Sequence, residues 1–162
     1  MAGAVFPWRG ANQFDLLIDG SEFFPRMLAA IDQAQAHVDL ELYLVEAGRC
    51  AEAIVQALEQ AARREVRVRC LFDGYGCLAF TMGLRRRLTD AGVELRFYNP
   101  LSWRRGVNNL YRDHRKLLLV DQQWAVVGGT GVTDEFWQPD DNSCEWHEVM
   151  VAIKGRLVQD WQ

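Results

Sequence analysis

The feature that most constrains the fold is an alternation of strand-like and helix-like apolar patterns along the chain. Within 37–45, apolar residues take every second position, which is typical of a strand. Within 50–64, apolar residues recur at helical spacing. Strand patterns also cover 13–19, 66–73 and 93–99, and helical patterns cover 21–35 (with Ser21 as candidate N-cap) and 81–91. Strand–helix–strand repeats of this kind predict an α/β domain with right-handed crossovers.

In the second half of the chain, the predicted strands lie closer together. A long loop is expected over 99–112, followed by a hairpin of two strands, 114–121 and 124–129. A third strand is expected over 146–153 and a short helix over 155–162. We expect the hairpin to turn at Gln122-Gln123. Because a helix of about seven residues is marginal alone, we expect this chain to be one part of a longer protein.

Composition narrows the classes of function. The chain has 162 residues, which suits one domain, and a formal net charge of -4, which argues against a nucleic-acid partner. Its four cysteines show no C-x-x-C spacing and its three histidines are scattered, so no zinc site and no cofactor are expected. The start lacks the apolar region of a signal peptide, and no apolar run is long enough to span a membrane.

A histidine and a lysine stand out on the predicted strand 114–121. His114 and Lys116 are two residues apart, so they share one strand face. One interpretation is a solvated face of an edge strand, with Asp121 starting a turn. The other is catalytic, because an imidazole is a nucleophile toward phosphorus and an ammonium neutralises charge on phosphate oxygens. The strand pattern alone leaves both interpretations open.

A wider motif carries a family resemblance. The spacing H-x-K-x4-D-x6-G-G, formed by His114, Lys116, Asp121, Gly128 and Gly129, resembles the signature of the phospholipase D superfamily. The upstream segments FDLLIDG, LELYLVE and VRVRCLFDGYG are similar to strands of the bacterial cardiolipin synthase branch. The resemblance implies a mixed sheet flanked by helices, an α/β/α sandwich, forming one lobe of a two-lobe pseudo-dimer.

The resemblance also implies catalytic roles. His114 attacks phosphorus and forms a phosphohistidine, Lys116 holds phosphate oxygens, and Asp121 supports the local strand geometry. Glu148, in WHEVMVAIKG, takes the place of the family's usual Asp and is expected to orient the His114 ring. That role predicts a carboxylate oxygen about 2.6–3.2 Å from a ring nitrogen.

Substrate contacts are expected just after the glycine pair. The family often has Asn two residues after that pair, where this chain has Gly131. The backbone of Gly129, Thr130 and Gly131, or the hydroxyl of Thr133, is therefore expected to contact the phosphate instead.

One such motif supplies half of a phosphodiester site, because the leaving alkoxide needs a separate acid. We therefore expect residues 1–162 to be a single lobe, the N-terminal half of a larger two-lobe enzyme, or else a symmetric homodimer. The implied function is phosphatidyl transfer on phospholipids at the cytoplasmic side of a membrane, with peripheral association. The alternatives are a single-motif phosphodiesterase or nuclease acting as a homodimer, and an inactive half-domain.

The aromatic and basic residues of the long loop, and Glu41, can each be interpreted in two ways. Trp103, Arg104, Arg105 and Tyr111 mix aromatic and basic character, which suits a lipid interface or a loop packed on its own aromatic rings. Glu41 interrupts an apolar strand, and a solvated position is favoured over a place in the site.

Overall fold

The computed structural model describes residues 7–161, which fold around one mixed seven-stranded sheet. The strand order is β1-β7-β6-β5-β2-β3-β4. The strands are β1 (Gln13–Ile18), β2 (His37–Leu42), β3 (Arg67–Asp73), β4 (Glu94–Tyr98), β5 (Leu117–Val120), β6 (Trp124–Gly128) and β7 (Val149–Lys154). Strands β2, β3 and β4 are parallel, and the other neighbouring pairs are antiparallel.

Helices alternate with the first four strands, as the sequence predicts: one connects β1 to β2, and two connect the parallel strands β2, β3 and β4. They are α1 (Gly20–Gln33), α2 (Arg49–Arg63) and α3 (Met82–Asp90). In α2, Ile54, Leu58 and Ala61 are buried, so the helical spacing of apolar residues does point one face at the sheet. The expected mixed sheet flanked by helices is therefore confirmed.

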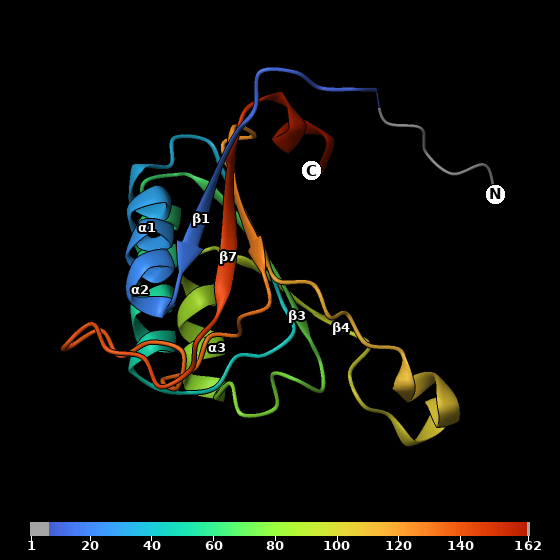
Figure 1. Cartoon of the computed structure of the whole chain (residues 1–162). Helices are drawn as coiled ribbons and strands as arrows, with labels where there is room; N and C mark the ends of the chain where they lie inside the picture. Colours follow the sequence, from blue (N-terminus) through green and yellow to red (C-terminus); the bar gives the residue numbers. More distant parts are fainter. Residues whose placement is uncertain (1–6, 162) are drawn as a thin grey trace.

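The two faces of the sheet differ in their cover. In Figure 1, α1, α2 and α3 lie on the same face, where Leu40, Phe72 and Leu118 belong to the main core. Within residues 7–161, the opposite face carries only the short 3-10 helix η2 (Arg156–Trp161). Val158 of η2 packs there on a small second cluster with Leu119.

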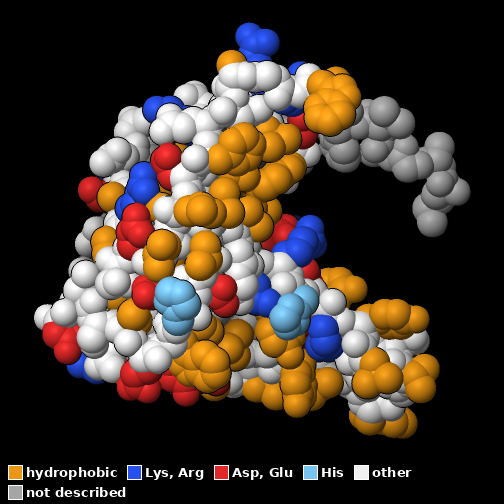
Figure 2. Space-filling view, viewed as in Figure 1, with side chains coloured by type: hydrophobic (Ala, Val, Ile, Leu, Met, Phe, Trp, Pro, Cys, Tyr) orange, Lys and Arg blue, Asp and Glu red, His pale blue; other side chains and the backbone are white. Residues whose placement is uncertain are grey.

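The sheet face opposite the α-helices is apolar along β1 and β7. Leu16, Ile18 and Val149 are 68%, 51% and 40% exposed. Figure 2 shows hydrophobic side chains along a hollow on this side of the molecule. Among the helices that the structure describes, none combines the length and the hydropathy of a membrane-spanning segment.

Several boundaries differ from the sequence-based expectations. Strand β5 begins at Leu117, so His114 and Lys116 precede it rather than lie within it. The hairpin with β6 is confirmed, but its turn is centred on Asp121 and Gln122, whose φ angles are 51° and 57°. Two successive residues with positive φ match the right-handed twist of the flanking strands.

The cap of α1 and the long loop also differ. Ser21 lies inside the first turn of α1, and Asp19 takes the N-cap position without a side-chain cap bond. The Ile18 amide instead donates to Glu22 Oε2 at 2.8 Å, which joins the end of β1 to the helix. Within the predicted loop 99–112, the structure contains the 3-10 helix η1 (Trp103–Leu110).

Candidate active site

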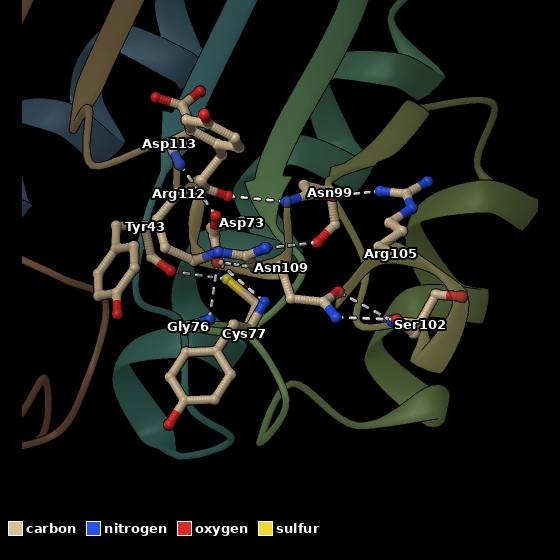
Figure 3. Close-up of polar contacts among 12 residues, drawn as sticks. Tyr43, Asp73, Gly76, Cys77, Asn99, Ser102, Arg105, Asn109, Arg112 and Asp113 are labelled. Carbon is tan, nitrogen blue, oxygen red and sulfur yellow. Dashed lines mark hydrogen bonds and ion pairs between the residues drawn. The ribbon is translucent and has the colours of Figure 1, made fainter. Parts of the chain in front are cut away.

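The candidate nucleophile lies on a segment, 112–116, that belongs to no helix or strand and leads into β5. Asp73, at the end of β3, anchors the start of this segment. Its Oδ2 accepts a hydrogen bond from the Asp113 amide at 3.0 Å, and its Oδ1 lies 3.3 Å from Arg112 Nη1 (Figure 3). The Asp73 side chain is fully buried. A buried carboxylate with these partners fixes the backbone one residue before His114.

Asp73 also organises its own turn. Its Oδ1 accepts hydrogen bonds from the Tyr75 and Gly76 amides at 2.8 and 3.0 Å. Arg112 in turn donates to the Asn99 carbonyl at 2.9 Å (Figure 3). The ends of β3 and β4 and the approach to β5 are therefore joined at one point beside the site.

Asp121 anchors the other end of β5. Its carboxylate accepts hydrogen bonds from the amides of Gln35, Ala36 and His37 at 2.8–2.9 Å. Burial alone would raise the pKa of Asp121, but these three amides outweigh it and hold the pKa below its usual value. Asp121 thus ties the end of β5 to the start of β2.

His114 and Lys116 meet directly. Lys116 Nζ lies 2.8 Å from His114 Nδ1 and donates to the His114 carbonyl at 2.9 Å. The histidine is exposed, whereas the lysine side chain is buried at 6% exposure. Burial lowers the pKa of Lys116, and the negative charges of Glu148 and Asp113 partly oppose that shift.

Tyr43 completes this cluster, and sequence reasoning did not assign it. Its ring centroid lies 4.2 Å from that of His114, and Lys116 Nζ lies 5.2 Å from the same tyrosine centroid. The ring therefore limits how the imidazole and the ammonium can move. Its position two residues after Glu41, on the same side of an alternating segment, was the available signal.

Glu148 lies close to the cluster but does not make the expected hydrogen bond. Its Oε1 accepts from the Val149 amide at 2.9 Å, and no bond joins it to His114 in the described structure. The position facing Nδ1 is taken by Lys116 instead. A Cβ built on Gly129 would lie 2.7 Å from Glu148 Oε2, so a side chain at this position would make the Glu148 carboxylate shift.

The residues predicted to contact phosphate differ in how exposed they are. Gly129 is exposed, beside Glu148. Thr130 and Thr133 are 1% and 3% exposed, and the Thr130 hydroxyl donates to the Gly131 carbonyl at 3.2 Å. The Thr133 hydroxyl, one of the two expected phosphate contacts, is therefore buried, while a contact through the backbone of Gly129, Thr130 and Gly131 stays a prediction.

Glu41 belongs to an ion-pair cluster rather than to a purely solvated face. Its Oε2 lies 3.1 Å from Arg115 Nε, and Arg115 also pairs with Asp113 at 2.9 Å. Burial raises the pKa of Glu41, against the lowering effect of Arg115. The pair to Arg115 is the main reason that the pKa of Asp113 is lowered. These charges flank His114 on both sides in the sequence.

Comparison with known proteins identifies the family of this chain. The family model described as "Cardiolipin synthase, PLD-like domain" matches residues 27–161. Cardiolipin synthase B of Salmonella typhi is 34% identical over 155 residues, 94% of this chain and 37% of that protein. The major cardiolipin synthase ClsA of Bacillus subtilis is 28% identical, over 93% of this chain and 33% of that protein. The chain thus spans about a third of these curated relatives.

Solved structures share the fold at low identity. Nuc from Salmonella typhimurium, a phospholipase D family member, superposes with a TM-score of 0.70 at 19% identity. That match covers 93% of this chain and 90% of Nuc. NucT from Helicobacter pylori gives a TM-score of 0.68 at 12% identity, over 93% of this chain and 91% of its own. Together with the family match, these findings confirm the resemblance read from the motif: the chain belongs to the cardiolipin synthase, phospholipase D-like domain family.

Proposed function

We propose that this chain supplies the nucleophilic half of a phosphatidyltransferase acting on phospholipids at a membrane surface. One observation carries the proposal: the exposed His114 ring has the Lys116 ammonium 2.8 Å from its Nδ1, which leaves Nε2 available. A nucleophile and a phosphate-binding cation are thus placed side by side. The family's curated relatives are named cardiolipin synthases, which makes a phospholipid the natural substrate class.

The proposed reaction has two displacement steps. The lone pair of His114 Nε2 attacks the lipid phosphorus as the bond from phosphorus to the headgroup oxygen breaks. The leaving alkoxide takes a proton from an acid on the opposite side of the phosphorus. In the second step, an acceptor hydroxyl gives its proton to the group that acted as the acid and attacks phosphorus, and the bond to Nε2 breaks. A lipid or small-alcohol acceptor gives transfer, and water gives hydrolysis.

The first step requires a change in the histidine's partner. An ammonium only donates, so the observed contact makes Nδ1 the acceptor and places the ring proton on Nε2. Attack needs the opposite tautomer, with Nδ1 protonated. We propose that substrate phosphate draws Lys116 away, that the ring loses its Nε2 proton to solvent and gains one from solvent at Nδ1, and that the Glu148 carboxylate then accepts a hydrogen bond from Nδ1–H. Glu148 already lies near enough for its charge to act on Lys116.

The acid is proposed to come from a second phospholipase D-like lobe, of the same longer protein or of a second copy. Support comes from the length comparison, since the chain spans about a third of its curated relatives. The exposed apolar side chains along β1 and β7 also suit contact with another lobe. Two histidines facing each other then satisfy the in-line geometry.

The proposal is tested with phosphatidylglycerol carrying a labelled phosphate. The complete protein should transfer the phosphatidyl group and become labelled at His114, and His114→Ala should lose the label. His37→Ala is the matched control and should keep the label, because His37 lies at the start of β2, outside the cluster. Label at another residue of this lobe contradicts the assignment. Cleavage of DNA without any lipid turnover favours the phosphodiesterase alternative.

A further inference from the structure

A projecting segment beside the site exposes a second apolar surface. Residues 99–112 leave the end of β4, form η1 and return to His114, and they stand apart from the body of the molecule (Figure 1). No residue of η1 is buried. Five large apolar or aromatic side chains are exposed on the segment: Leu101 50%, Trp103 86%, Val107 78%, Leu110 79% and Tyr111 66%. The segment therefore does not pack on its own aromatic rings.

This segment is held in shape by polar contacts rather than by a core. The Asn99 side chain donates to the carbonyls of Asn108 and Tyr111 at 2.7 and 2.8 Å. The Asn109 side chain bonds both the amide and the carbonyl of Ser102, at 3.1 and 2.8 Å (Figure 3). An ordered segment presents its exposed apolar side chains without the entropic cost of ordering a flexible loop on contact.

Charge distinguishes this segment from the rest of the chain. The whole chain has a net charge of -4, but 99–112 contains three arginines and no Asp or Glu. Arg112 is used internally, against Asp73. Arg104 lies over the Trp103 ring, 5.1 Å from its centroid. The tip thus combines an indole, aliphatic side chains and cationic groups, the combination found where proteins contact the headgroup region of anionic bilayers.

We propose that 99–112 is the membrane-docking element of this lobe and that it binds the surface of an anionic phospholipid bilayer. This inference rests on the proposed function, because it explains how the site reaches a lipid. Tyr111 precedes His114 by three residues, which bounds their separation at about 10 Å. A bilayer that contacts the exposed Tyr111 side chain therefore lies close to the nucleophile.

Co-sedimentation with vesicles tests the inference without using activity. The protein should bind vesicles of phosphatidylcholine containing phosphatidylglycerol. The double variant Trp103→Ser/Leu110→Ser should bind at least about tenfold more weakly, since each buried anchor contributes appreciably to binding. The control Trp8→Ser/Leu78→Ser removes the same residue types at positions that are 104% and 60% exposed, and its binding should be unchanged.

Two further variants separate the sources of binding. Arg104→Gln should weaken binding to anionic vesicles about fivefold, and high salt should abolish that difference. His114→Ala should bind vesicles like the wild type, so a failure of the catalytic proposal and a failure of membrane docking give different results.

Three outcomes overturn the inference. One is equal binding by the two double variants, and a second is no binding of the wild type to anionic vesicles. The third is loss of self-association in Trp103→Ser/Leu110→Ser with vesicle binding unchanged, which assigns the segment to contact with another lobe.

Discussion

Asp73 offers the sharpest test of how the fold positions His114. Its carboxylate is fully buried and accepts from three backbone amides and Arg112. Asp73→Ala removes all of these bonds and leaves the Arg112 guanidinium, whose side chain is 15% exposed, without its carboxylate. Removing one partner of a buried pair costs about 3–5 kcal/mol. For a domain of this size, that corresponds to a fall in Tm of about 6–20 °C.

The assay is urea unfolding at neutral pH, followed by circular dichroism. A reduced midpoint with an unchanged slope shows a loss of stability rather than a change in compactness. Asp73→Asn keeps an oxygen that accepts from the Tyr75 and Gly76 amides. Its NH2 group, however, replaces the oxygen that accepts from the Asp113 amide, so that amide loses its hydrogen bond. The expected cost of Asp73→Asn is smaller, about 1–3 kcal/mol.

A double-mutant cycle isolates the pair itself. Asp73→Ala and Arg112→Met are measured separately and together, and the coupling free energy should be about 0.5–3 kcal/mol. Both single variants should also lower kcat, because Asp73 fixes the backbone next to His114. A loss of less than about 1 kcal/mol for Asp73→Ala, or strictly additive effects, would refute this account of the anchor.

Three further predictions concern the charges and space around the site. Glu148→Gln removes a negative charge that raises the pKa of Lys116. The alkaline limb of the pH–rate profile should therefore move to lower pH in this variant than in the wild type. An alkaline limb at the same pH in both proteins excludes this coupling. Asp121→Ala should cost about 1 kcal/mol at neutral pH, discounted for partial exposure. The pKa of Asp121 is lower in the folded than in the unfolded protein, so the stability lost in Asp121→Ala should be largest above the unfolded-state pKa. The loss should disappear as the pH falls through the folded-state pKa and Asp121 becomes protonated. A loss that does not change with pH in urea titrations contradicts this reasoning. Gly129→Ala should displace the Glu148 carboxylate and lower kcat with the fold intact by circular dichroism, whereas Gly10→Ala, which meets nothing within 4 Å, should not; equal kcat for both removes the spatial argument.

The reactive pair shows what short-range sequence can and cannot predict. Two residues apart on a predicted strand, His114 and Lys116 had to share a face, and the structure places their nitrogens 2.8 Å apart. The orienting partner expected for His114 was Glu148, which is distant in sequence, but the structure places Lys116 at Nδ1. The Glu148 carboxylate bonds the Val149 amide here, a local contact that competes with the expected one.

By itself, the sequence determined the strand and helix alternation, the β5–β6 hairpin and the family, because periodicity and motif spacing act over a few residues. Only the tertiary structure decided that Asp73 holds Asp113, 40 residues away, and that Tyr43 packs on His114. It also decided that the side chains of 99–112 are exposed, because the sequence pattern of an apolar loop is the same whether or not another element packs on it. Contacts between distant segments follow from how the sheet is assembled, and local patterns carry no record of that assembly.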